Sequence, residues 1–232
     1  MASHKPGTLY IIASPIGNME DITLRALRIL KEEAQYAYCE DTRQTAKLLR
    51  HYGISLPLQS LHAHSSDEKV LRAVNLLLDG TSIAYLTDSG TPGVSDPGGR
   101  LVHAAFEHHI PVIPVPGPSA LTAIASVAGF PEKNILFAGF LSKKDGKKKR
   151  EIEHLLEFDG ILVIYESPYR IKKLITILND LVPDASIVIG REISKLYEEI
   201  RRGSVREIYE SLDSLIERGE FAIALYRGKK RD

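Results

Sequence analysis

The 232-residue sequence has one cysteine, no tryptophan and no excess of either charge, with 30 Lys and Arg against 30 Asp and Glu. A single cysteine excludes an internal disulfide framework and any metal site built from several thiolates, and it suits a reducing compartment. Balanced charge excludes a global electrostatic attraction to nucleic acid. A nucleic-acid partner would therefore require a local basic patch.

A membrane-spanning segment is also missing from the pattern. The longest uncharged run, residues 110–131, is long enough for a bilayer. It contains Pro111, Pro114, Pro116 and Pro118, which would break a continuous helix. The amino terminus is short and polar, without the apolar stretch of a signal peptide. We expect a cytoplasmic protein with no membrane association.

Eight short apolar runs typical of strands alternate with helical patterns along the chain. The runs cover residues 9–13, 36–39, 83–86, 112–115, 135–138, 161–165, 187–189 and 221–226. This alternation predicts an α/β fold with mostly parallel strands. Ser65 and Glu68 form a capping-box pattern before one helix. Residues 142–149 suggest a long polar loop, and residues 197–205 a strand or hairpin.

The prolines at residues 114–118 mark a break between halves of similar size. We therefore expect two α/β domains, residues 1–116 and 117–232. The first half is slightly acidic and the second slightly basic.

Three loops rich in glycine and proline follow predicted strands, at residues 14–18, 87–99 and 114–120. Ligands of α/β sheets bind at the carboxyl ends of strands, and glycine lets a backbone approach a ligand closely. The loops favour a small-molecule site. They carry neither a Walker motif nor a dinucleotide fingerprint. No metal site is predicted, because Asp88 with Asp96, and His62 with His64, each lack a third ligand.

A basic cluster, defined here as the six cations within residues 143–150, is the largest local charge excess. Its members are Lys143, Lys144, Lys147, Lys148, Lys149 and Arg150, and a smaller group follows at residues 229–231. Such a cluster could neutralise RNA phosphates. On its own, however, a lysine run is more often a solvated loop.

Seven motifs occur in an order that resembles one family. They are "TLYIIASPIGNMEDITLRAL" (8–27), "CEDTRQTAKLL" (39–49), "LTDSGTPGVSDPG" (86–98), "PVPGPSALTA" (114–123), "FAGFL" (137–141), "YESPYRI" (165–171) and "GREISKLYEEIRRGSV" (190–205). Together they resemble the ribosomal RNA small subunit methyltransferase I family, which is similar in fold to the tetrapyrrole methylases. The resemblance covers roughly residues 8–228.

The resemblance implies methyl transfer from S-adenosylmethionine to the ribose 2′-hydroxyl of a cytidine in 16S rRNA, in the decoding region of the small ribosomal subunit, with S-adenosylhomocysteine as product. It also implies a homodimer of two-domain chains with the ligand cleft between the domains. Carried over by motif, the cofactor-binding residues are Pro15, Asp88, Ser89, Gly90, Val94, Ser119, Ala120, Tyr165, Glu166, Ile193 and Ala222. Many family members have a further C-terminal segment, so no RNA-binding role is carried over from it.

A weakly acidic ribose hydroxyl calls for a positioned base, and several residues at predicted strand ends are candidates. They are Glu40, Asp41, Glu166, Glu192 and Lys195. Asp41 could equally cap the following helix or hold Arg43, and Glu192 could form an ion pair with Lys195.

RNA contacts are expected from the basic cluster and from Arg43, Arg170 and Arg191, with the family resemblance favouring this over a solvated loop. Two alternative functions remain open: a methylase of a tetrapyrrole such as a corrinoid or sirohaem precursor, and an inactive ribosome-associated binder. The lysine cluster argues against the first alternative and the intact loop motifs against the second.

Overall fold

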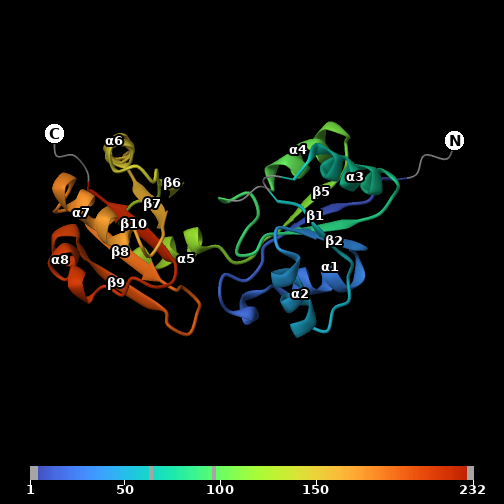
Figure 1. Ribbon diagram of the computed structural model, residues 1–232, viewed down its shortest axis with the longest axis horizontal. Coiled ribbons are helices and arrows are strands. Elements are labelled where there is room, and N and C mark those ends of the chain that lie inside the picture. Colours follow the sequence, from blue (N-terminus) through green and yellow to red (C-terminus); the bar gives the residue numbers. More distant parts are fainter. Residues whose placement is uncertain (1–4, 63–64, 96–97, 229–232) are drawn as a thin grey trace. The chain divides into compact units, whose positions relative to one another are not determined.

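The computed structural model describes residues 5–62, 65–95 and 98–228, and Figure 1 shows its helices and strands. His64, Asp96 and the cations at 229–231, noted in the sequence, lie outside these residues. The chain divides into two compact units, Met1–Ser119 and Ala120–Asp232. Each unit has its own five-stranded sheet and is described by itself.

The first unit contains a parallel sheet in the order β3-β2-β4-β1-β5. The strands are β1 (Leu9–Ile12), β2 (Tyr36–Cys39), β3 (Leu58–Ser60), β4 (Ile83–Leu86) and β5 (Val112–Val115). Four of them match predicted apolar runs. The short edge strand β3 was not predicted, because its sequence, Leu-Gln-Ser, contains no apolar run.

Helices cover both faces of this sheet (Figure 1). Helices α1 (Leu24–Glu32) and α2 (Thr42–His51) pack on one face, and α3 (Asp67–Leu78) and α4 (Gly99–Glu107) on the other. The capping box predicted at Ser65 is wrong. Ser66 is the N-cap of α3, and the Ser65 hydroxyl instead accepts a hydrogen bond from the His62 N–H, at 2.9 Å.

The second unit contains a mixed sheet in the order β6-β7-β10-β8-β9. Its strands are β6 (Ile135–Phe140), β7 (Ile161–Glu166), β8 (Ser186–Arg191), β9 (Glu199–Ser204) and β10 (Phe221–Tyr226). Strands β6 and β7 are parallel, whereas the other three pairs are antiparallel, so the prediction of mostly parallel strands is wrong here. Residues 197–205 contain one strand, β9, as the first of the two predicted alternatives has it, and β9 pairs antiparallel with β8.

In this unit α5 (Ala120–Ala128) packs on one face of the sheet. Helices α6 (Asp145–Leu155), α7 (Ile171–Leu181) and α8 (Val205–Glu210) cover the other (Figure 1). The polar loop predicted over residues 142–149 is wrong from Asp145 onward, where α6 begins. Lys148 and Ile152 lie four residues apart and share the buried face of α6. The lysine-rich sequence hid the helix because one of its two buried positions is itself a lysine.

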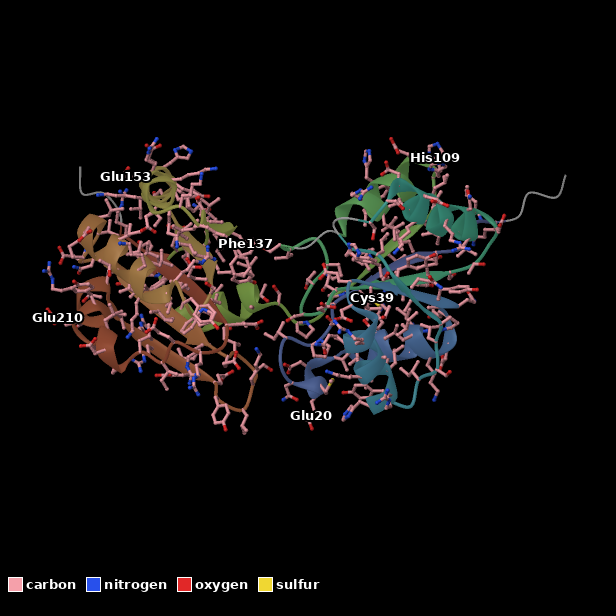
Figure 2. All side chains as sticks on the ribbon, viewed as in Figure 1. Glu20, Cys39, His109, Phe137, Glu153 and Glu210 are labelled. Atoms are coloured by element: carbon pink, nitrogen blue, oxygen red, sulfur yellow. The ribbon has the colours of Figure 1, made fainter. Side chains whose placement is uncertain are left out.

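The uncharged run at residues 110–131 contains β5, a turn and α5, as the prolines predicted. Within the described ranges, no helix is both long and apolar enough to cross a bilayer. Cys39 is buried at the end of β2 (Figure 2), as expected for a small apolar side chain.

Candidate functional site

The loops after β1 and β4 are joined by backbone hydrogen bonds. The Ser14 N–H donates to the Gly90 carbonyl at 2.9 Å, and the Gly90 N–H donates back to the Ser14 carbonyl at 3.1 Å. The buried Ser14 hydroxyl donates to the Thr87 carbonyl at 2.8 Å. These contacts fix Pro15, directly after Ser14, beside the loop of Asp88, Ser89 and Gly90.

The turn after β5 packs against the same two loops. The Thr91 hydroxyl donates to the Pro118 carbonyl at 3.0 Å. A Cβ on Gly117 would lie 2.9 Å from the Ala13 Cβ, closer than real Cβ contacts allow. Gly90 has a φ of +83°, in the left-handed region that glycine tolerates. The three predicted loops therefore form one preformed surface, which we call the loop cluster.

The loop cluster lies at the position where α/β sheets bind ligands. Strand β4 is flanked by β2 and β1. The chain leaves β1 and β2 toward α1 and α2 on one face, and leaves β4 toward α4 on the other. Chains that diverge to opposite faces leave a crevice at the carboxyl ends of such strands. Asp88 and Ser89 are exposed at this point and Val94 is half-buried, whereas Ser119, also predicted there, is buried.

Asp41 connects the end of β2 to the loop cluster. Its N–H donates to Asp88 Oδ1 at 3.0 Å. Its carboxylate caps α2 by accepting from the Arg43 N–H at 2.8 Å and forms an ion pair with the Arg43 guanidinium at 2.6 Å. Both roles left open in the sequence are present. These bonds from the Arg43 side chain and backbone lower the pKa of Asp41 to about 2.

This low pKa predicts a pH-dependent contribution of Asp41 to stability. A carboxylate whose folded pKa lies below its unfolded value of 3.8 stabilises the fold above that value, and the contribution is lost as the pH falls through about 2. Asp41→Asn keeps a capping oxygen but removes the charge. We expect the variant to be less stable than wild type by a constant margin above about pH 5, and by a shrinking margin below it.

Urea unfolding of wild type and Asp41→Asn from pH 7 down to about pH 3 measures the difference in stability between them. Salt at 1 M should reduce this difference, because Arg43 is exposed and its charge is screened. A margin that stays constant down to pH 3 would contradict the prediction.

In the second unit, four predicted cofactor residues lie on the α5 face of the sheet. Tyr165 and Ala222 are directly paired across β7 and β10. Ile193 and Ala120 pack against the same apolar cluster. Motif residues far apart in the chain therefore lie on one contiguous surface.

Glu166 does not belong to that surface. It follows Tyr165 on β7 and so points to the opposite face, where its side chain is fully buried. Its carboxylate pairs with Lys148 Nζ at 2.7 Å and Arg170 at 2.6 Å, and it accepts a hydrogen bond from the Ser167 N–H at 2.8 Å. We call these three charged side chains the buried triad. A carboxylate so engaged is not placed to touch the cofactor or to act as a base.

Glu192 and Lys195 form the ion pair that the sequence suggested. Lys195 Nζ lies 2.8 Å from Glu192 and 2.9 Å from Glu220, and the Glu220 N–H donates to Glu192 at 2.9 Å. Burial alone would raise the pKa of Glu192, but the hydrogen bonds from Lys195 and Glu220 outweigh it and lower that pKa. Burial would lower the pKa of Lys195, but its two carboxylate partners raise it. This network closes the turn between β8 and β9.

The basic cluster is not uniform. Lys143, Lys144, Lys147, Lys149 and Arg150 are exposed and make no ion pair or side-chain hydrogen bond with any residue that the structure describes. Lys148 is only 1% exposed and belongs to the buried triad, so its assignment as an RNA contact is corrected. Of the predicted arginines, Arg43 pairs with Asp41, Arg170 with Glu166 and Arg191 with Glu199.

Sequence reasoning missed the hydroxyls that hold the loop cluster together and the exposed ring of Phe140. Strand β6 shifts register between Phe137 and Gly139, and Gly139 has a φ of +64°. This bulge redirects Phe140, which is 57% exposed. A glycine inside the "FAGF" strand was the available sequence signal for this bulge.

In the described part of the chain, no group of three or more His, Cys, Asp or Glu side chains is arranged to hold a metal ion.

Comparison with known proteins gives consistent matches. A family model described as Tetrapyrrole (Corrin/Porphyrin) Methylases matches residues 8–209. A curated protein from Leptospira biflexa, named Ribosomal RNA small subunit methyltransferase I, is 42% identical over 225 residues, covering 97% of this chain and 92% of the relative. Its namesake from Coprothermobacter proteolyticus is 42% identical over 218 residues, covering 94% and 97%.

Solved structures share the two-domain fold at low sequence identity. The methyltransferase CobJ has a TM-score of 0.69 at 18% identity, covering 97% of this chain and 96% of that one. Uroporphyrin-III C-methyltransferase from Thermus thermophilus, complexed with S-adenosylhomocysteine, has a TM-score of 0.62 at 22% identity, covering 95% and 97%. The predicted α/β fold class is confirmed.

Proposed function

Since this chain belongs to the ribosomal RNA small subunit methyltransferase I family within the tetrapyrrole methylases, we propose that it methylates the ribose 2′-oxygen of a cytidine in 16S rRNA. Family membership supports a methyltransferase of small-subunit rRNA. The choice of a cytidine as the target and of its 2′-oxygen as the methylated atom goes beyond family membership and is our proposal. The observation that carries it is the loop cluster, which brings together Pro15, Asp88, Ser89 and Gly90, residues that the family motifs assign to the methyl donor.

The chemistry of the loop cluster supports the proposal that it binds S-adenosylmethionine. Gly117 leaves backbone exposed where a Cβ would crowd Ala13 of a neighbouring loop, and Gly90 adopts a left-handed conformation that suits glycine. Asp88 and Ser89 present polar side chains to solvent, suited to a ribose or an amino-acid group. We propose that these residues, with Pro15 and Val94, hold the cofactor. The motif residues of the second unit proposed for the same ligand are Ala120, Tyr165, Ile193 and Ala222.

When bound, S-adenosylmethionine supplies an electrophilic methyl group. The task of the chain is to align the acceptor oxygen, exclude water and accept the hydroxyl proton. Three of the five candidate bases, Glu166, Glu192 and Lys195, are held in ion pairs. Asp41 is a weak base at a pKa of about 2. Glu40 is the base that we propose, because it is half-buried at the end of β2 and directly precedes Asp41, whose N–H bonds Asp88 of the loop cluster.

A tetrapyrrole substrate is the competing proposal within the same fold. The solved neighbours that are named for a tetrapyrrole substrate are at most 22% identical, and at that level the likeness supports the fold alone. The rRNA methyltransferases are 39–42% identical over most of the chain. The exposed lysines of α6 also suit a phosphate-bearing substrate better than a macrocycle.

Labelled methyl transfer separates these proposals. The chain is incubated with labelled S-adenosylmethionine and one of three substrates: small ribosomal subunits lacking the modification, free 16S rRNA, or a tetrapyrrole precursor. We expect label in rRNA, at a 2′-oxygen of one cytidine when the nucleotide is mapped. Label on a base, or only in the macrocycle, would contradict the proposal. Donor binding without transfer to any substrate would favour an inactive binder.

The family resemblance also leads us to propose a homodimer that acts in the cytoplasm on the small ribosomal subunit. Light scattering after size exclusion tests the dimer, and co-sedimentation with small subunits tests the association. A monomer at micromolar concentration would remove the dimer from the proposal.

A further inference from the structure

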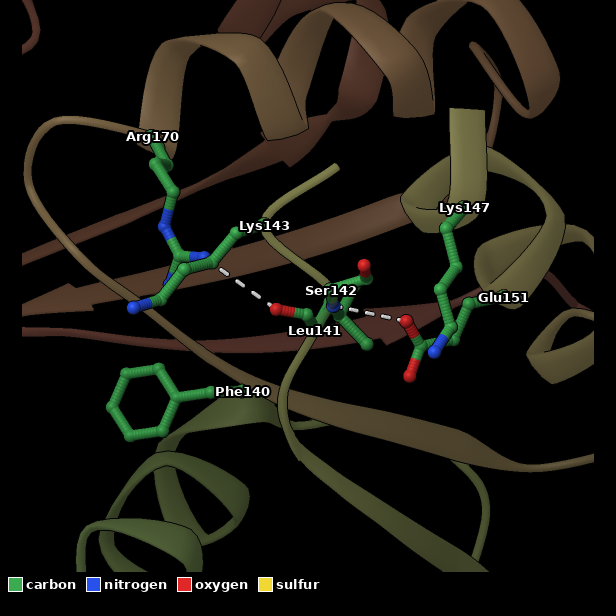
Figure 3. Close-up of a pocket in the computed structure, with 7 residues that line it drawn as sticks. All are labelled: Phe140, Leu141, Ser142, Lys143, Lys147, Glu151 and Arg170. Atoms are coloured by element: carbon green, nitrogen blue, oxygen red, sulfur yellow. Dashed lines mark hydrogen bonds between the residues drawn. The ribbon is translucent and has the colours of Figure 1, made fainter. Parts of the chain in front are cut away.

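An open pocket of about 560 Å³ lies on the second unit beside the amino-terminal end of α6 (Figure 3). Its lining is formed by Phe140, Leu141, Ser142, Lys143, Lys147, Glu151 and Arg170. Its volume is in the range of about 300–1,000 Å³ typical of small-ligand sites. We call it the α6 pocket.

The α6 pocket is electropositive. Lys143, Lys147 and Arg170 bring three positive charges against one carboxylate, that of Glu151. Glu151 is engaged by the Ser142 N–H at 3.0 Å. Lys143 and Lys147 are exposed and make no ion pair with any residue in the described ranges. Two lysine ammonium groups without protein partners at one depression favour an anionic ligand.

Arg170 is held in place by buried groups. Its guanidinium pairs with Glu166 at 2.6 Å and donates from Nε to the Ser167 hydroxyl at 2.9 Å. Glu166 is in turn fixed by Lys148, and both of these side chains are at least 99% buried. Lys148 and Arg170 together exceed the single charge of Glu166 by one. The buried triad therefore presents a preorganised positive group to the pocket, and Arg170 remains 23% exposed.

The pocket also offers an aromatic ring. The bulge at Gly139 directs Phe140 outward, on the same side of the Leu141–Ser142 backbone as Lys143 and Arg170 in Figure 3. Its ring centroid lies 5.8 Å from that of Tyr165, one of the motif-assigned cofactor residues. An exposed ring beside cations matches a nucleotide, whose base stacks while its phosphate pairs with the cations.

We infer that the α6 pocket binds one nucleotide of single-stranded RNA, with its phosphate on Arg170 and the two lysines and its base stacked on Phe140. The inference rests on the proposed function, because it identifies where the RNA substrate is gripped next to Tyr165. It makes Lys148 and Glu166 positioning residues for Arg170.

The test compares two pairs of substitutions that remove the same charge from the same helix region. Lys143→Ala with Lys147→Ala alters the pocket, whereas Lys149→Ala with Arg150→Ala alters exposed cations that do not line it. The probe is a fluorescent single-stranded RNA of about 12 nucleotides, and anisotropy is measured over a range of salt concentrations. We expect about tenfold weaker binding for the pocket pair, with a smaller salt slope, and less than about threefold for the control pair.

Phe140 provides a second, uncharged test. Phe140→Ala should weaken RNA binding about tenfold and Phe140→Tyr should restore it, since stacking needs only a ring. Equal losses for the two charge pairs, or no effect of Phe140→Ala, would overturn the inference.

Separate assays distinguish this failure from a failure of the proposed function. Binding of S-adenosylmethionine should be unchanged in all variants. If wild type methylates rRNA while the pocket pair binds RNA as the control pair does, the pocket inference is wrong and the function stands. If wild type methylates no RNA, the proposed function fails whatever the binding data show.

Discussion

Lys148→Met is expected to lower the free energy of unfolding of the second unit by about 3 kcal/mol. The substitution removes one partner of a buried ion pair and leaves the Glu166 carboxylate inside the unit with Arg170 as its remaining charged partner. Breaking such a pair typically costs about 3–5 kcal/mol, because the remaining charge has lost its compensation. We expect a loss at the lower end of this range because Arg170 still pairs with Glu166 in the variant.

Lys149→Met is the matched control. Lys149 is the next residue of α6 and is exposed, so its substitution should change stability by no more than about 0.5 kcal/mol. Amide hydrogen exchange in α6 and β7 localises the effect better than a single melting curve, because a chain with two units need not unfold in one step. Similar protection in the two variants would contradict the buried triad as a stabilising element.

A double-mutant cycle with Glu166→Gln isolates the ion pair itself. The double variant should lose less stability than the sum of the single losses, because each single change already removes the pair. Strictly additive losses would indicate that Lys148 and Glu166 stabilise the unit independently of each other.

Gly117→Ala is expected to weaken binding of S-adenosylmethionine about a hundredfold. Its Cβ would lie 2.9 Å from the Ala13 Cβ, so the turn after β5 must move away from the loop after β1. Displacing groups of a preorganised site by about 1 Å can cost a factor of about 100 in reaction rate, and we expect a loss of the same order in affinity. Isothermal titration with the cofactor measures the loss.

A rescue variant tests whether this contact is the cause. Ala13→Gly removes the Cβ that Gly117→Ala would meet, and the double variant should recover most of the lost affinity. Gly146→Ala serves as a control, because Gly146 is an exposed residue of α6 with open space around its Cβ position and no left-handed backbone conformation. Failure of Ala13→Gly to rescue binding would contradict the proposed role of this contact.

Strands β1, β2, β4 and β5 of the first sheet could be predicted because each of them has an apolar sequence that can be recognised on its own. Strands buried on both faces, such as Ile83–Leu86, have continuous apolar sequences that stand out from helical patterns. The direction of the strands in the second sheet could not be predicted. An antiparallel strand such as Phe221–Tyr226 is as apolar as a parallel one when both its faces are covered. Pairing partners are a tertiary property that composition does not carry.

The candidate site residues likewise include some that could be predicted from the sequence and some that could not. Motif order grouped Tyr165 with Ala222, which are paired in the sheet. It also grouped Tyr165 with Glu166, although neighbouring residues of a strand face opposite ways. Lys148 could not be separated from Lys147 and Lys149 by type, since only the helix phase of α6 shows which of three adjacent lysines is buried.

The strand order of the first sheet has a consequence for synthesis on the ribosome. Strand β1 emerges first, but its neighbours are β4 and β5, with Leu9 opposite Ile83 and Val112. The sheet is therefore incomplete until nearly half of the chain has been made, and its first apolar strand must wait without its final partners. Such long-range pairing slows folding and exposes strand edges to aggregation. The β8–β9 hairpin, whose strands are close in sequence, carries no such delay. Nascent chains that pause before residue 112 should accordingly be the ones that depend on chaperones.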